Sequence, residues 1–278
     1  MLHSVPSTPH RTQASALLAE LYRHRHLAWE LTKRDLVDRY TGQIGGTMWA
    51  LVQPTVTIAV FILLFGSVFT PRVAVGAEAG GNQLLYLISG LVPWLALADA
   101  LGRSPHIIVG NAPLVKQVSF PLVVLPIKSL LPSFIILPVG HGLLLAYTLA
   151  TTGSLPASWL LLPLCWAMLI LTALGLAYCL SAIAVFFRDL GNILQLVLFL
   201  GLYISPIFYR LEAAPPALRL VMQLNPFTYI ILCFQDATSY GGVQHPLAWG
   251  VAGVLTLLAC LLGARVFSGL QRYFGSYL

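Results

Sequence analysis

Long apolar runs follow one another from residue 48 onward, and each is about as long as a helix that crosses a bilayer. The runs are continuous, whereas strands of a membrane barrel alternate polar and apolar side chains over about ten residues. The pattern therefore predicts an all-α integral membrane protein. Its six predicted transmembrane helices are 48–69, 84–101, 121–150, 158–187, 190–209 and 246–264.

Composition supports this prediction. Of the 278 residues, 58% are hydrophobic and only 9% are charged, and the mean hydropathy is +0.84. Soluble domains carry about a quarter charged residues. The chain thus has too few polar side chains to cover a globule in water, which excludes a soluble protein.

The distribution of Lys and Arg predicts the orientation. Of the fifteen such residues, twelve fall in segments on one side of the predicted spans, and three, Arg72, Arg210 and Arg219, fall on the other. Because cytoplasmic loops are enriched in Lys and Arg, both termini are expected in the cytoplasm. Topology then accounts for the net charge of +6, and no nucleic-acid partner is expected.

The segment before the first span divides in two. Residues 1–13 are expected to be disordered, and residues 14–41 to form a cytoplasmic amphipathic helix lying at an interface. Gly42, Gly45 and Gly46 then interrupt the helix so that the chain can turn into the bilayer. One stripe of the helix, at helical spacing, carries Trp29, Thr32, Leu36 and Tyr40.

The other face of this predicted helix is charged. Glu30, Arg34 and Asp38 follow at i,i+4 spacing, and Asp35 faces Arg39. Two interpretations stay open on these residues alone. The helix either anchors the chain at the membrane surface or presents a docking surface to a cytoplasmic protein.

The stretch 205–246 is too apolar for a solvated loop and too broken for one span. Pro215, Pro216 and Pro226 divide it into two short pieces, 216–224 and 226–237. Irregular backbone at membrane depth survives only where protein buries it or where it lines a cavity. These pieces are therefore predicted to form a lid over an outward-facing opening.

Motifs for catalysis and for nucleotide binding are absent from the sequence. It holds no GxxxxGK[ST], HExxH or GxSxG motif, so we expect no catalytic residue, cofactor or metal in this chain. Asp99 is the one acid noted near a span, and Arg103, four residues on, is expected to pair with it. His141 is expected to be a packed core histidine. A transporter built this way needs an external source of energy.

Four stretches, in chain order, resemble the ABC type-2 permeases that export polysaccharides. They are KRDLVDRYTGQIGGTMWALVQP (33–54), NAPLVKQVSFPLVVLP (111–126), FFRDLGNILQLVLFLGLYISPIFY (186–209) and LNPFTYII (224–231). Together they span most of the chain. The resemblance implies a homodimer of this chain with two copies of a separate cytoplasmic ATPase subunit, which would use ATP and Mg.

The resemblance also implies roles for individual residues. The residues expected to couple to the ATPase are Glu30, Arg34, Asp38, Arg39, Asn111, Lys116, Arg188 and Asp189. Those expected to line the channel and contact the substrate are Tyr40, Trp49, Gln53, Phe61, Phe65, Phe69 and Tyr203. Those expected in short periplasmic gate helices between the fifth and sixth spans are Pro215, Pro216, Asn225, Pro226 and Phe227. Packing or an interfacial aromatic belt is the competing explanation for each aromatic.

The expected function is that of a multi-pass permease in a bacterial inner membrane, moving a lipid-linked polysaccharide, O-antigen above all. Residues 47–267 would form the transmembrane domain and 268–278 a cytoplasmic tail. Exporters of capsular polysaccharide and of teichoic acid are the nearest alternatives. Two alternatives from other classes are a passive scaffold and a membrane-embedded enzyme acting on polyprenyl lipids. The enzyme would require acids, His or Arg clustered at one membrane face, which the sequence does not indicate.

Overall fold

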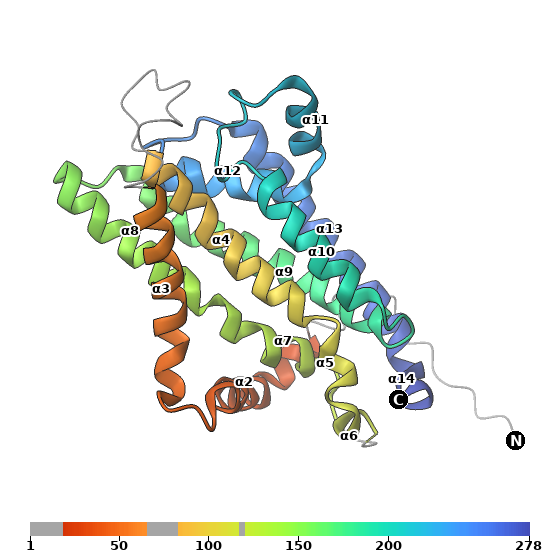
Figure 1. Cartoon of the computed structure of the whole chain (residues 1–278). Coiled ribbons are helices and arrows are strands. Elements are labelled where there is room, and N and C mark those ends of the chain that lie inside the picture. Colours follow the sequence, from red (N-terminus) through yellow and green to blue (C-terminus); the bar gives the residue numbers. More distant parts are fainter. Residues whose placement is uncertain (1–18, 66–82, 117–119) are drawn as a thin grey trace, which may run out of the picture.

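Helices make up every regular element in the part of the chain that the computed structural model describes, residues 19–65, 83–116 and 120–278 (Figure 1). The predicted disordered segment 1–13 and Phe69 lie outside these ranges. In chain order the elements are α2 (Arg25–Tyr40), η1 (Gly46–Met48), α3 (Trp49–Leu63), α4 (Gln83–Arg103), α5 (His106–Val109), α6 (Ala112–Val115), α7 (Val124–Leu130), η3 (Leu131–Ile135), α8 (Ile136–Thr152), η4 (Ala157–Leu161), α9 (Leu162–Ala184), α10 (Leu190–Ile204), α11 (Pro216–Leu224), α12 (Pro226–Thr238), α13 (Pro246–Leu270), η5 (Gln271–Tyr273) and α14 (Phe274–Tyr277).

Several of these helices are suited to a bilayer. Five stretches are long and apolar enough to cross it: Gly46–Leu63, Gln83–Arg103, Val124–Thr152, Ala157–Ala184 and Pro246–Tyr277. A sixth is reached if α11 and α12, bent by 94° at their junction, count as one span. Helix α10 is apolar but has only 15 residues. An all-helical membrane protein with five or six candidate spans is thus confirmed.

Prolines explain where the observed helices depart from the predicted spans. Helix α10 ends at Ile204 rather than at 209, because Ser205 precedes Pro206 and takes an extended conformation. The third predicted span is helical from Val124 to Thr152, but it tightens to a 3-10 turn around Pro132, which has no N–H to donate. The residues expected as a tail instead continue the last span through η5 and α14.

Helices α9 and α13 make the most extensive helix–helix contact among the described residues. A Cβ atom built on Gly263 would lie 2.0 Å from the carbonyl oxygen of Gly175, so only glycine fits at this crossing. Thr172 and Thr256 share a hydrogen bond of 2.9 Å between the same two helices. Small residues that let backbones approach and hydroxyls that bond across helices are typical of membrane helix pairs.

The two ends of the molecule differ in character (Figure 1). Helices α2, α5, α6 and α14 gather at one end, which we call the α2 end, and α11 lies at the other, the α11 end. Gly42 and Gly46 take positive φ values of 85° and 50°, which lets the chain turn from α2 into α3. Between the two ends, α4 is the most buried candidate span and α3 the least.

Candidate functional site

The solvent face of α2 carries paired charges. Arg34 lies 3.7 Å from Asp38, as the i,i+4 spacing predicts, but Glu30 pairs with Lys33 at 2.7 Å and not with Arg34. The side chains of Glu30, Arg34 and Asp38 are 68%, 79% and 65% exposed. Exposed pairs of this kind add little stability. These charges are therefore available to meet another protein.

Arg39 points the other way, into the membrane helices. Its Nε lies 3.0 Å from Asp35, as predicted, and its Nη1 lies 3.9 Å from Asp99 of α4. Its Nη2 donates to the carbonyl oxygen of Ser129 in α7. With its side chain only 13% exposed, Arg39 is not on the charged solvent face with which the sequence grouped it. It joins α2 to α4 and α7 instead.

A cavity of about 180 Å³ opens beside this junction. Asp99 and Arg103 form the predicted ion pair on its wall, at 2.9 Å. Tyr40 and Gln53, both predicted to line the channel, lie on the same wall. The cavity therefore combines side chains from α2, α3 and α4 at the α2 end, and its polar lining could receive the charged or hydroxyl-rich part of a ligand.

The remaining coupling candidates come from two connections. Asn111, between α5 and α6, donates to the Ile107 carbonyl oxygen at 2.7 Å and accepts from Lys128 at 2.8 Å. Lys116 donates to the Leu278 carbonyl oxygen at 3.0 Å. Arg188 and Asp189 are exposed in the turn between α9 and α10. Asp189 occupies the N-cap position of α10, but its side chain makes no capping hydrogen bond with the described residues.

Aromatic side chains from α3 and from the end of α10 form one group. Phe61 of α3 and Phe65, two residues after the end of α3, stack with ring centroids 6.2 Å apart, which confirms that the two rings lie on the same side of this segment. Phe208 lies 5.5 Å from Phe65 and 5.8 Å from Tyr203, so it links the two helices. Trp49 lies apart from this group, with its indole ring against Gly45.

The segment predicted to form the gate is divided into two helices, as the sequence predicts. Helices α11 and α12 meet at Asn225, with Pro216 and Pro226 opening them and Pro215 at the N-cap of α11. The Asn225 Oδ1 accepts from the Phe227 backbone N–H at 3.1 Å and thereby caps α12, and its Nδ2 donates to Ser205 Oγ at 3.0 Å. The corner between the two helices is therefore tied to the end of α10.

Replacing Asn225 with alanine is expected to destabilise this corner by about 1 kcal/mol, because α12 loses its N-cap acceptor. Thermal unfolding of the purified protein in detergent measures the effect. Asn225→Asp is the control, since it keeps the acceptor and loses only the bond to Ser205. An alanine variant as stable as the aspartate variant would contradict the capping role.

An Asp–His pair at the α11 end has no counterpart in the sequence predictions. Asp236 of α12 is fully buried, and its Oδ1 lies 2.7 Å from His245 Nδ1. Its Oδ2 accepts from the backbone N–H of His245 and from Trp249 Nε1, both at 3.0 Å. His245 Nε2 in turn lies 3.4 Å from Glu212. The sequence indicated no cluster of acids and histidine, and the fold brings this one together from separate segments.

The two carboxylates beside His245 determine the protonation state of its ring. The hydrogen bonds with Asp236 and Glu212 raise the pKa of His245 to about 9, and His245 lowers the pKa of Glu212. His245 is thus cationic at neutral pH. The only local signal for the group was an acid inside an apolar stretch with a histidine nine residues later.

This pairing predicts a pH dependence of stability. Because folding raises the pKa of His245, its contribution is complete below about pH 6.5, where unfolded histidine is also protonated, and is lost as the pH rises through about 9. The contribution of Glu212 has the opposite sign and is lost as the pH falls below 4.5. Thermal unfolding midpoints should fall by a few degrees between pH 7 and pH 10. His245→Gln should flatten that slope, and an unchanged slope would count against the pairing.

Comparison with known proteins decides the family. Residues 26–238, from α2 to the end of α12, match the ABC-2 type transporter family. The chain is an ABC-2 type transporter protein. This confirms the resemblance seen in the sequence and makes the chain a multi-pass membrane protein of the bacterial inner membrane.

Curated relatives of this ABC-2 type transporter chain are named as export or transport proteins. It is 30% identical over 223 residues to the O-antigen export system permease protein RfbA of Myxococcus xanthus, covering 79% of this chain and 82% of that protein. It is 24% identical over 254 residues to the RfbA of Klebsiella pneumoniae, covering 89% and 93%. It is 20% identical over 238 residues to the polysialic acid transport protein KpsM of Escherichia coli, covering 84% and 89%.

Proposed function

We propose that this chain is the transmembrane subunit of an ATP-driven exporter that carries a lipid-linked polysaccharide, O-antigen above all, across the inner membrane. The observation that carries the proposal is similarity over 82% of the length of an O-antigen export permease, in a chain of five or six apolar helices. The family implies an ABC ATPase as partner. That subunit would use ATP and Mg, since this chain lacks a P-loop motif.

The α2 end of each copy is the proposed docking surface for one of the two ATPase subunits. The exposed charges of Glu30, Arg34 and Asp38 lie there, with Lys116 nearby. Arg39 would transmit movement of α2 into α4 through Asp99, rather than contact the partner. The excess of Lys and Arg in the segments at this end supports a cytoplasmic location for it, and a periplasmic one for α11.

A second copy of the chain is proposed to cover α3 and α10. Helix α3 is the least buried candidate span, and the apolar side chains of α10 are largely exposed, Leu196, Phe199 and Tyr203 among them. With α10 as a short fifth span, the chain would have six spans and the conduit would lie between the two copies. The aromatic group formed by Phe61, Phe65, Tyr203 and Phe208 would offer ring faces to a sliding glycan. Helices α11 and α12 would close its periplasmic end.

Cysteine cross-linking tests the dimer. Leu196→Cys in α10, in a chain whose four native cysteines are replaced by serine, is expected to give a covalent dimer upon mild oxidation in membranes. Leu171→Cys in α9 is the control, because it is also exposed on an apolar helix but lies outside the proposed interface. Equal cross-linking at both positions would indicate random collision and would contradict the assignment.

Co-purification and cell-surface analysis test the function itself. The tagged chain should bring down an ABC ATPase at equal stoichiometry, and deletion of its gene should leave the lipid-linked glycan inside the cell. If the chain instead exports capsular polysaccharide, which its similarity to KpsM would favour, deletion of its gene should remove the capsule from the cell surface. A polyprenyl-lipid enzyme would act without any ATPase. Both ring nitrogens of His245 already contact carboxylates, so the Asp–His pair has no free ring nitrogen to serve as a general base.

A further inference from the structure

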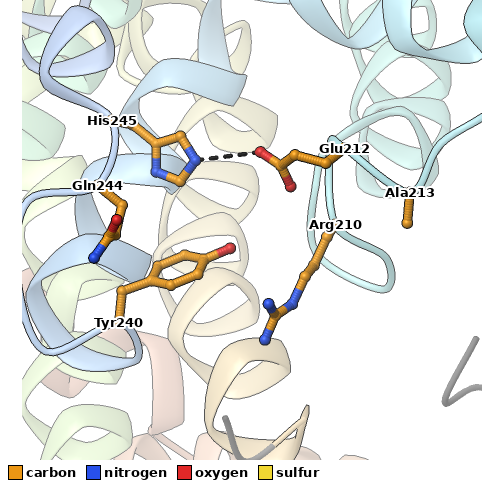
Figure 2. A pocket seen from close by; sticks show the side chains of 6 residues that line it. All are labelled: Arg210, Glu212, Ala213, Tyr240, Gln244 and His245. Carbon is orange, nitrogen blue, oxygen red and sulfur yellow. Dashed lines mark hydrogen bonds and ion pairs between the residues drawn. The ribbon is translucent and has the colours of Figure 1, made fainter. Parts of the chain in front are cut away.

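A pocket of about 480 Å³ lies at the α11 end, within the range of about 300 to 1,000 Å³ typical of small-ligand sites. Two connections form it: the one from α10 to α11 and the one from α12 to α13. Figure 2 shows the side chains around it, with the dashed contact between His245 and Glu212 along one edge. The residues that line it are Arg210, Glu212, Ala213, Tyr240, Gln244 and His245.

Contacts within the protein hold several of the side chains around this pocket in place. The buried carboxylate of Asp236 holds His245 by its ring and by its backbone N–H. The Arg210 guanidinium lies 5.4 Å from the ring centroid of Tyr240 and 5.5 Å from that of Tyr86 in α4. Tyr240 also meets the His245 ring edge-on at 5.4 Å. Side chains held in this way lose little entropy when they bind.

The balance of charge selects the kind of ligand. His245 is held between two carboxylates, Asp236 and Glu212, while Arg210 has no carboxylate within ion-pair distance among the described residues. The positive charges of Arg210 and His245 are therefore balanced by the negative charges of Asp236 and Glu212. The Glu212 side chain, 63% exposed, would repel a phosphate placed in the pocket. An uncharged ligand avoids this repulsion and can form hydrogen bonds in the pocket. Arg210 can donate, Glu212 can accept, and Gln244 and Tyr240 can do both.

We propose that this pocket binds an uncharged segment of the exported glycan, so that its sugar hydroxyls meet Arg210, Glu212 and Gln244 beside the ring of Tyr240. The inference rests on the proposed function, because it assumes that the cargo is a polysaccharide. The pocket follows α10 in the chain and lies between the segment that leads into the start of α11 and the segment that leaves the end of α12. Its position thus suits a subsite that holds the leading glycan as it leaves the conduit and hinders backward sliding.

Photo-cross-linking in cells tests whether glycan occupies the pocket. A benzophenone amino acid at Ala213, on the pocket rim, should give a glycan adduct under ultraviolet light. The same amino acid at Leu155, exposed in the loop between α8 and α9 and outside the lining, should give none. The adduct should disappear in cells that make no glycan. An adduct only with protein or lipid at position 213 would overturn the proposal.

Binding to the purified transporter separates sugar from anion recognition. Neutral oligosaccharides released from the host's own surface polysaccharide are the probe, with inorganic pyrophosphate as competitor. Gln244→Ala should weaken oligosaccharide binding at least about fivefold, while Gln271→Ala, a matched amide outside the lining, should not. Pyrophosphate binding in preference to the sugar, or equal effects of both variants, would refute the subsite. If gene deletion still blocks glycan export, the proposed function stands after such a refutation.

Discussion

Leucine in place of Gly263 is expected to leave almost no folded protein in the membrane. A Cβ atom there would lie 2.0 Å from the Gly175 carbonyl oxygen, which belongs to the backbone of α9 and cannot rotate away. Overpacking a core usually costs about 1 to 3 kcal/mol, when flexible side chains can shift. Here two helices would have to separate, which would also break the Thr172–Thr256 hydrogen bond.

Gly253→Leu is the matched control for this prediction. Gly253 lies on the same helix, α13, but a Cβ there meets nothing within 4 Å. Fluorescence-detected size-exclusion chromatography of detergent extracts compares the monodisperse fraction of the two variants. A Gly263→Leu protein as abundant and monodisperse as Gly253→Leu would show that the helices tolerate separation, contrary to the packing described above.

Exchange of two charges on α2 is expected to reduce export at least about tenfold without loss of folded protein. In the double variant Arg34→Asp with Asp38→Arg, the i,i+4 ion pair and the net charge are retained, so the helix keeps its stability. The surface shown to a partner is nevertheless inverted, and like charges placed across an interface cost several kcal/mol.

Three measurements check this exchange. The amount of ATPase that co-purifies and the transport-linked ATP hydrolysis should both fall, while the yield of monodisperse protein should not. Arg265→Gln, which removes an exposed arginine from α13 outside the proposed docking surface, should change none of them. Wild-type export by the exchanged variant would remove α2 from the coupling surface.

Local sequence was most informative at prolines, which have no backbone N–H to donate. Pro216 and Pro226 can open a helix but rarely continue one, so two short helices were predicted as 216–224 and 226–237 and are observed as Pro216–Leu224 and Pro226–Thr238. The spacing of Phe61 and Phe65 placed both rings on one face, since residues four apart on a helix are neighbours.

Contacts between distant segments could not be predicted in the same way. Periodicity placed Arg39 with the exposed charges of α2, but its direction depends on Asp99, sixty residues later in the chain, and on the Ser129 carbonyl oxygen. Asp236 resembles an ordinary polar interruption until the fold brings His245 and Trp249 against it. Both residues depend on tertiary packing, which no local pattern encodes.

Helix α4 has a mechanical consequence for the whole transporter. It is one continuous helix of 21 residues, about 30 Å long, with Pro93 in its middle, Asp99 near its last turn and Tyr86 in its first. Asp99 contacts Arg39, and Tyr86 lies under Arg210 while donating to the Pro206 carbonyl oxygen at 3.0 Å. An axial shift of this helix by the width of a single atom would therefore displace contacts at the α2 end and at the α11 end together, with no relay of intermediate steps between them.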